Sequence, residues 1–179
     1  MNTRSTGGRR ALVDESKAKD YLLVAVTVDG SEHLRARRVV QSLVLRGQSR
    51  LHMRKESDTR RRTILAALED LPLTTTVFRA RKDGRSDLLR RGACIHALVR
   101  WAVTADVDDI CFELDETLLR HDRQRLVEAV HGVRPRSVGH RHERATHEPL
   151  LALPDALGWA WAKGGDWRRR CGHVEIIES

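Results

Sequence analysis

The stretch Arg9–Ser16, with the sequence RRALVDES, is where the fold can first be read. Three apolar residues follow a basic segment and end on two adjacent acids, Asp14 and Glu15. The next apolar run, DYLLVAVTV over residues 20–28, is rich in β-branched side chains, so the two runs and their short polar link predict a β-hairpin. Asp14 is then either an acid that caps a turn at the strand end or the first ligand of a metal site.

The rest of the chain alternates between helical and extended patterns. Apolar residues recur at helical spacing over 31–44, 57–71, 86–104, 120–130 and 149–161, and short extended runs occupy 73–78, 109–115 and 137–145. The order β-β-(α-α)-β-α-β-α-β-α indicates one α/β domain with a five-stranded sheet. We expect this domain to span residues 11–165, with a helical insertion at 31–71, a disordered segment at 1–10 and a C-terminal tail at 166–179.

Composition excludes several classes of protein. With 179 residues, 40% of them hydrophobic, the chain can bury a core, yet no run approaches the roughly 18 apolar residues of a membrane span. The first residues lack the apolar segment of a secretory signal. The three cysteines, Cys94, Cys111 and Cys171, form no CxxC pair, which argues against a zinc ribbon or a disulfide framework. We therefore expect a cytoplasmic protein without a membrane partner.

The charge balance is strongly basic and dominated by arginine. There are 33 basic and 25 acidic residues, a net charge of +8, and the five lysines leave 28 arginines. Arginine binds phosphate with two parallel hydrogen bonds and stacks on bases, which favours a nucleic-acid partner. A genome that encodes arginine often would produce the same bias, so charge alone supports this partner only weakly.

Three aspartates occupy places where a ligand site forms in α/β proteins. Asp14 and Asp115 each end an apolar strand, and Asp155 lies within the apolar helix sequence LLALPDALGW. Ligand sites of open α/β sheets form beyond the carboxyl ends of the strands, so Asp14 and Asp115 converge if their strands are parallel neighbours. Each acid taken singly has a structural explanation; together they predict a metal site.

Clustered carboxylates need a cation, and their hard oxygen atoms suit Mg²⁺ or Mn²⁺. Two such ions about 4 Å apart can activate a water and stabilise the leaving oxygen when a phosphodiester bond is cleaved. This chemistry is the first functional hypothesis for the three aspartates.

The same residues carry a resemblance to a known superfamily. Without segment 31–71 the element order resembles the RNase H-like fold, and the placement of Asp14, Asp115 and Asp155 is similar to the acidic site of that superfamily. More closely, VDES, LHMRKE, FELDE and PLLALPDALGWA resemble a bacterial family known as the domain of unknown function 3800. This resemblance spans about residues 11–165 and implies a metal-dependent nuclease that uses two ions.

The chain departs from the superfamily pattern in one respect that concerns the site. The superfamily often supplies a further acid from the helix after the third strand, and here that helix offers only Asp87, at its start. Glu113, two residues before Asp115 and so on the same strand face, or Glu15 is expected to replace it. His52, in LHMRKES, matches a position where the resemblance expects a histidine near a glutamate, here Glu56; it is either a general acid or base or a part-buried structural residue.

Other basic and aromatic residues have two interpretations each. The clusters Arg60-Arg61-Arg62 and Arg168-Arg169 are predicted to contact nucleic acid, although surface solvation explains them as well. His140 and His142 share a strand face as a metal pair would, but a solvated edge strand is the preferred interpretation. Trp159 and Trp161 lie on an apolar helix and are expected in the core.

The sequence thus leads to two functions from different classes. The first is a nuclease that cleaves RNA or an RNA-containing duplex with Mg²⁺ or Mn²⁺, in which Asp14, Asp115, Asp155 and Glu113 hold the ions. The second is a non-catalytic nucleic-acid-binding or assembly module on the same fold, which the missing helix acid favours.

Overall fold

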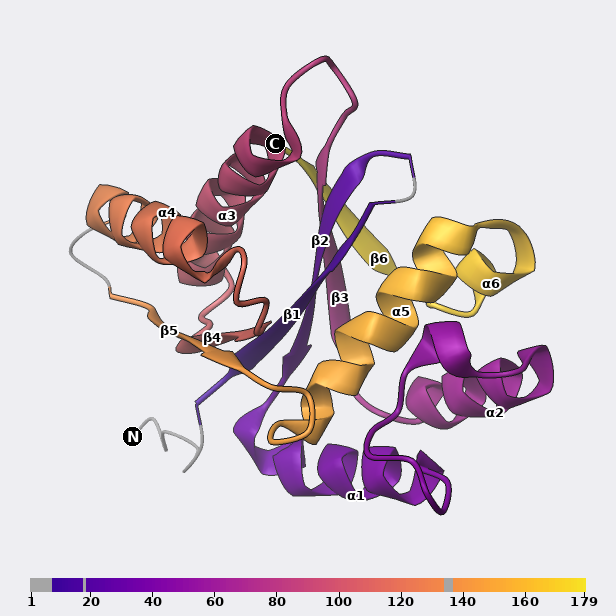
Figure 1. Ribbon diagram of the computed structural model, residues 1–179. Coiled ribbons are helices and arrows are strands. Elements are labelled where there is room, and N and C mark those ends of the chain that lie inside the picture. The colour runs from indigo at the N-terminus through magenta and orange to yellow at the C-terminus, as the bar shows by residue number, and fades with distance from the viewer. Residues whose placement is uncertain (1–7, 18, 134–136) are drawn as a thin grey trace.

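The chain folds as a six-stranded mixed sheet with helices on both faces (Figure 1). The computed structural model describes residues 8–17, 19–133 and 137–179. The strands lie in the order β5-β4-β1-β2-β3-β6. Their bounds are β1 Arg10–Ser16, β2 Tyr21–Val28, β3 Thr74–Ala80, β4 Asp109–Glu113, β5 Gly139–Glu143 and β6 Val174–Glu178.

The predicted hairpin is present and forms the centre of the sheet. β1 pairs antiparallel with β2, and β2 pairs antiparallel with β3. β1 also pairs in parallel with β4, as the site prediction required, with Val13 beside Phe112. All eight residues of β2 are buried, so this strand reads as a continuous apolar run because helices cover both of its faces.

Helices cover the two faces of the sheet in two layers (Figure 1). One layer contains α1, α2, α5 and α6, and the other contains α3 and α4. Their bounds are α1 His33–Leu43, α2 Asp58–Glu69, α3 Asp87–Thr104, α4 Leu119–Gly132, α5 Ala152–Lys163 and α6 Gly165–Arg169. Short 3-10 turns precede three of the helices, at Gly30–Glu32, Met53–Lys55 and Pro149–Leu151. No described helix is long and apolar enough to cross a membrane.

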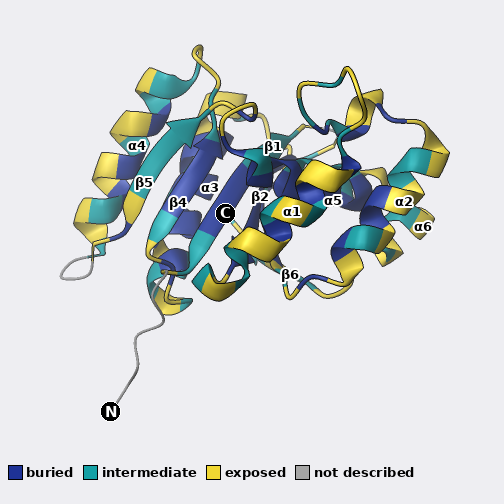
Figure 2. Ribbon diagram, turned by 90° about the horizontal axis from the view of Figure 1, so that it is seen from below, coloured by how far each residue is buried: buried dark blue, intermediate teal, exposed yellow. Residues whose placement is uncertain are grey.

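Side chains of β1 alternate between two cores, one on each face of the sheet. Leu12 packs in the core under α1, α2 and α5, whereas Ala11 and Val13 pack in the core under α3 and α4. Because strand side chains alternate, Asp14 points to the face of α5 and Glu15 to the face of α3. Figure 2 shows the buried central strands between these layers.

The structure differs from the sequence prediction at the C-terminus. Five strands were expected, and the sixth, β6, comes from the segment expected as a tail; it pairs in parallel with β3 at the sheet edge. The motif VEIIE is too short and too exposed to stand out as a strand, since only two of its five residues are even half-buried. The rest of the α/β prediction, including the helical insertion between β2 and β3, is confirmed. Most of the segment expected to be disordered, residues 1–7, lies outside the described residues, and Arg10 already begins β1.

Candidate active site

A cleft of about 600 Å³ opens where β1 and β4 end against α5. Acidic side chains from three elements line it: Asp14 from β1, Glu113 from β4 and Asp155 from α5. His52, from the loop before α2, lines it as well. The residues that line the cleft are Asp14, Glu15, Ser16, Lys17, His52, Arg54, Glu113, Pro154, Asp155, Gly158, Trp159, Ala162 and Lys163.

Asp14 is the acid whose ionisation this environment changes most. Burial, followed by the negative charges of Glu113 and Asp155, raises the pKa of Asp14 from 3.8 to about 7. The backbone N–H of Glu15 donates a hydrogen bond to Asp14 Oδ1 at 2.7 Å. Among the described residues this half-buried carboxylate has two acidic neighbours and no cationic partner, an electrostatic situation that a bound cation relieves.

Asp155 is held in place by the loop before α2. The backbone N–H of Met53 donates to Asp155 Oδ2 at 2.8 Å, and His52 Nδ1 lies 3.3 Å from Oδ1. These contacts explain how a carboxylate that is 12% exposed is tolerated in an apolar helix. The helical insertion therefore positions the acid of α5, a contact between residues about 100 positions apart in the chain.

Glu113 and Asp115 differ in a way that the sequence did not indicate. β4 ends at Glu113, whose side chain points to the same face as the buried Cys111, toward α5. The chain then turns, and Asp115 is exposed and accepts hydrogen bonds from Thr117 N and Oγ1, at 2.9 and 2.6 Å, which lower its pKa. Asp115 was expected to end the strand, but it lies beyond it, in a smaller pocket of about 160 Å³ that Asp14 and Glu113 also line. The structure thus brings together Asp14, Glu113 and Asp155, and leaves Asp115 outside the main cleft.

Arg50 is a residue of the site that the sequence prediction missed. Its Nη1 lies 2.7 Å from Glu113 Oε1, so this arginine of the insertion binds the acid of β4. Neither residue carried a signal of the pairing, because they are 63 positions apart and no motif joins them. The insertion consequently contacts two of the three acids in the cleft.

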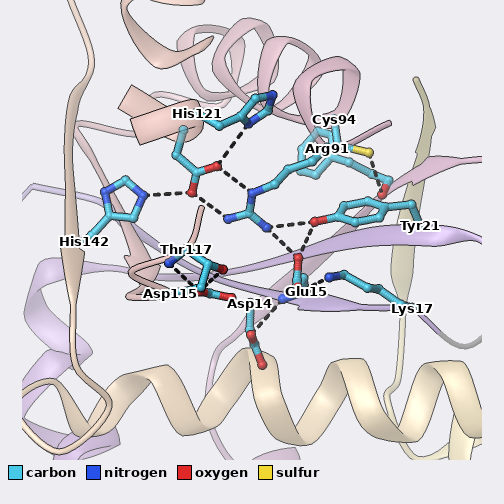
Figure 3. A network of polar contacts seen from close by, with 12 residues as sticks. Asp14, Glu15, Lys17, Tyr21, Arg91, Cys94, Asp115, Thr117, His121 and His142 are labelled. Atoms are coloured by element: carbon cyan, nitrogen blue, oxygen red, sulfur yellow. Dashed lines mark hydrogen bonds and ion pairs between the residues drawn. The ribbon is translucent and has the colours of Figure 1, made fainter. Parts of the chain in front are cut away.

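Glu15 also lines the cleft, but its carboxylate lies on the other face of β1, because strand side chains alternate. Figure 3 shows it pointing away from Asp14, toward Arg91 and Tyr21. Arg91 Nη1 lies 2.6 Å from Glu15 Oε2, the Tyr21 hydroxyl donates to the same oxygen, and Lys17 Nζ lies 2.8 Å from Oε1. Glu15 is therefore neutralised within the chain.

Arg91 links Glu15 to a buried network that also includes His142. Arg91 donates from Nε and Nη2 to both carboxylate oxygens of Asp122 at 2.6 Å, and His142 Nε2 lies 3.0 Å from Asp122 Oδ2 (Figure 3). The His142 side chain is only 6% exposed and stacks on Phe112, so the preferred interpretation of a solvated strand face is wrong for this residue. An arginine inside an apolar helix, at position 91, was the available signal of such a network.

The arginines predicted to contact nucleic acid are largely engaged within the chain. Arg60 binds Glu56, and Arg61 binds Asp58 and covers the Trp159 ring with its guanidinium at 4.4 Å. Arg62 lies over Trp167, Arg168 over Trp161, and Arg169 pairs with Asp166. In the described part of the chain none of the five lines the cleft, although Arg168 lines a neighbouring hollow.

The side chains of the cleft are of the type that binds a divalent cation, but they do not lie close enough together to bind one as they stand. Three carboxylates, the ligands that Mg²⁺ and Mn²⁺ prefer, surround one cleft. Among the described residues, however, no three His, Cys, Asp or Glu side chains lie close enough together to hold a metal ion as they stand. Asp155 and Glu113 instead contact His52, Met53 and Arg50. A cation would be held by Asp14, Glu113 and Asp155 after their side chains turn toward it.

Comparison with known proteins supports the fold alone. No protein-family model and no curated protein matches this chain. A chain in the solved structure of the PCNA:RNase HII complex from Archaeoglobus fulgidus is similar, with a TM-score of 0.57 and 14% sequence identity over 86% of this chain and 72% of that one. The protein thus has an RNase H-like fold, whereas its expected link to the bacterial family of unknown function is not shown.

Proposed function

We propose that this protein is a metal-dependent nuclease that cleaves phosphodiester bonds in RNA or an RNA-containing duplex. The observation that carries the proposal is the meeting of Asp14, Glu113 and Asp155, from three elements, in one cleft. In the RNase H-like fold this is the end of the sheet where the first and fourth strands stop side by side. Two Mg²⁺ or Mn²⁺ ions would neutralise the negative charges of these acids and of the substrate phosphate.

Each residue of the cleft has its own role in the proposed reaction. Asp14, Glu113 and Asp155 would hold the ions, and His52 orients Asp155 from Nδ1 or exchanges a proton at the cleft wall. Arg50 would compete with a cation for Glu113, because both bind the same carboxylate. Contacts of Arg60, Arg61, Arg62, Arg168 and Arg169 with the substrate, and a cytoplasmic location, stay predictions.

A cleavage assay tests the proposal. Single-stranded RNA, single-stranded DNA, RNA and DNA duplexes and an RNA–DNA hybrid are incubated with the protein and Mg²⁺ or Mn²⁺, with a chelator as the negative control. We expect cleavage of an RNA-containing substrate, and a loss of at least about 100-fold in rate for Asp14→Asn and Asp155→Asn, a range typical of residues that stabilise a transition state. Substrates that stay intact in every combination, or an Asp14→Asn variant as active as the wild type, contradict the proposal.

A comparison of Asp115→Asn with Glu113→Gln tests which of the two acids near the end of β4 takes part in cleavage. Because Asp115 lies outside the main cleft and Glu113 lines it, we expect Glu113→Gln to reduce cleavage far more than Asp115→Asn. Equal losses would restore Asp115 to the metal site that the sequence predicted.

A non-catalytic nucleic-acid-binding module on the same fold is the second candidate. The carboxylates of Asp155 and Glu113 already have partners within the chain, and the described residues contain no ready-made metal site. Salt-sensitive binding of RNA or DNA without metal-dependent cleavage would select this function over the first.

A further inference from the structure

We propose that the cleft continues along the C-terminal half of α5 as a basic track that binds the phosphodiester backbone of one nucleic-acid strand. The proposal rests on the proposed function, because it names how the substrate of that site approaches. A second hollow, of about 150 Å³, lies beside the cleft, and Ala162 lines both. The residues that line the second hollow are Lys19, Asp20, Leu22, Arg79, Trp161, Ala162 and Arg168.

An acid, an aromatic residue and a lysine follow one another along one face of α5. Asp155, Trp159 and Lys163 are spaced four residues apart and all line the cleft, so they follow one another along the same side of the helix. Lys163 is two turns, about 12 Å along the helix axis, from Asp155. It therefore reaches a phosphate other than the one at the carboxylates, whereas the part-buried Trp159 between them is already covered by the Arg61 guanidinium.

The cations of the track are available to a ligand. Arg54 and Lys163 in the cleft and Lys19 in the second hollow are exposed, and within the described chain their side chains have no carboxylate partner. Arg168 lies with its guanidinium over Trp161 at 4.1 Å and donates from Nε to the Trp161 carbonyl at 2.8 Å, which fixes its position without neutralising it. Four cations without a carboxylate partner among the described residues thus lie around two adjoining hollows.

The charges suit a nucleic-acid strand that has one phosphate at the acids of the cleft and other phosphates at the second hollow. The cleft holds Asp14, Glu113 and Asp155, whereas the second hollow has three cations, Lys19, Arg79 and Arg168, and one acid. Asp20, the acid of the second hollow, accepts a hydrogen bond from Lys82 N at 3.1 Å. Phosphates bound by Lys163, Lys19 and Arg168 would hold the strand while the neighbouring phosphate lies at Asp14 and Asp155.

Binding without catalysis tests the track. Fluorescence anisotropy measures the affinity of the full-length protein for labelled single-stranded RNA and DNA of about 12 nucleotides, in the presence of a chelator so that no metal contributes. The test variants are Lys163→Gln and Lys19→Gln. The controls are Arg100→Gln on α3 and Arg123→Gln on α4, which remove the same charge from exposed, unpaired cations of the described chain on the opposite helix layer.

We expect each test variant to raise Kd by about 5- to 10-fold and to reduce the slope of log Kd against log salt by about 0.7, as for one lost phosphate contact with a single strand. The controls should change Kd by less than about 2-fold, as expected for distant charges screened by salt. Equal effects of test and control variants overturn the track. Displacement of the oligonucleotide by polyglutamate at equal charge concentration also overturns it, since the surface would then be a site for acidic peptides.

The outcomes for the track and for the nuclease are independent. A protein that cleaves RNA while Lys163→Gln and Lys19→Gln bind normally contradicts the track alone. A protein that binds through the track but cleaves nothing with Mg²⁺ or Mn²⁺ contradicts the nuclease alone.

Discussion

Asp14 carries an unfavourable charge in the folded protein at neutral pH. Burial and the charges of Glu113 and Asp155 raise its pKa to about 7, above the value of about 3.8 that it has without them. An acid with a raised pKa binds its proton more tightly in the folded state, so its contribution to stability is most favourable below pH 3.8 and is lost as pH rises toward 7. Each unit of pKa shift corresponds to about 1.4 kcal/mol.

We therefore expect Asp14→Asn to be more stable than the wild type at pH 8, by at least about 1.4 kcal/mol, and to lose this advantage at pH 4. Urea denaturation in the presence of a chelator measures the difference at each pH. A variant that is less stable than the wild type at pH 8 would show that the Asp14 charge is compensated within the chain.

A divalent cation should reverse this difference. If Asp14, Glu113 and Asp155 hold the ion, Mg²⁺ or Mn²⁺ raises the unfolding midpoint of the wild type at pH 8, by linkage of binding to folding. The midpoint of Asp14→Asn should change little. Calorimetric melting with and without the metal gives both values, and an equal shift in the two proteins would place the ion elsewhere.

The contact between α5 and β2 depends on a glycine. A Cβ added at Gly158 would lie 3.1 Å from Val24 Cγ2, so a methyl group there would fit only if the Val24 side chain moved by a few tenths of an ångström. Because Asp155 is three residues away on the same helix, this contact also sets how close the acid lies to β1.

We expect Gly158→Ala to lower the free energy of unfolding by about 1–3 kcal/mol, the usual effect of overpacking. The matched control is Gly132→Ala at the end of α4, where an added Cβ meets nothing within 4 Å and a small gain of about 0.4–1 kcal/mol is expected. Urea denaturation measures both variants. Similar values for the two would show that α5 can shift without cost.

The network of Arg91, Asp122 and His142 joins α3, α4 and β5 on the face opposite the cleft. Asp122 is 1% exposed, and although burial alone would raise its pKa, hydrogen bonds from Arg91 and His142 lower it to about 2. Its stabilising contribution is therefore present above pH 3.8 and is lost as pH falls toward 2. Removal of Arg91 leaves a buried charge without its main partner.

We expect Arg91→Met to lower the free energy of unfolding by about 3–5 kcal/mol at pH 7, as for other broken buried ion pairs. Arg100→Met, on an exposed position of the same helix, should stay within about 0.5 kcal/mol of the wild type. The double variant Arg91→Met/Asp122→Leu should recover part of the loss, because the unpaired charge is then gone. A double variant no more stable than Arg91→Met would show that packing, and not charge, is the cause.

The whole sheet includes β6, which extends it beyond β3. Residues 174–178 pair in parallel with Thr75–Arg79, Glu178 pairs with Arg79, and Trp101 Nε1 donates to Glu175 Oε2 at 3.2 Å. A chain that ends at residue 172 exposes the edge of β3, whose backbone groups then lose their partners.

We expect this truncation to lower the melting temperature by several degrees and to increase hydrogen exchange in β3 but not in β5, at the other edge of the sheet. Glu178→Gln, which removes only a half-exposed ion pair, should cost less than about 1 kcal/mol. Melting followed by circular dichroism and hydrogen-exchange mass spectrometry give the two readouts; unchanged exchange in β3 would contradict a structural role for β6.

Local patterns determined most of the architecture. The alternation of Leu12, Val13, Asp14 and Glu15 fixes which acid faces α5, because strand side chains change face at every residue. The β-branched run of β2 and the helical spacing of α3 and α5 likewise depend on neighbours in sequence. These signals predicted the α/β order, the hairpin and the helical insertion, and the resemblance of that order to the RNase H-like fold agrees with the structural comparison.

Only the tertiary structure decided which groups meet and where elements end. The end of β4 at Glu113 rather than at Asp115, the contact of Arg50 with Glu113, the burial of His142 and the strand β6 all depend on residues far apart in the chain. No local pattern specifies such contacts, because the free energy of a short strand or a buried ion pair comes from the partner that packs against it. The sequence by itself placed Asp14 on β1 and Asp155 on α5, and the folded chain brought Glu113, and not Asp115, into the cleft that they line.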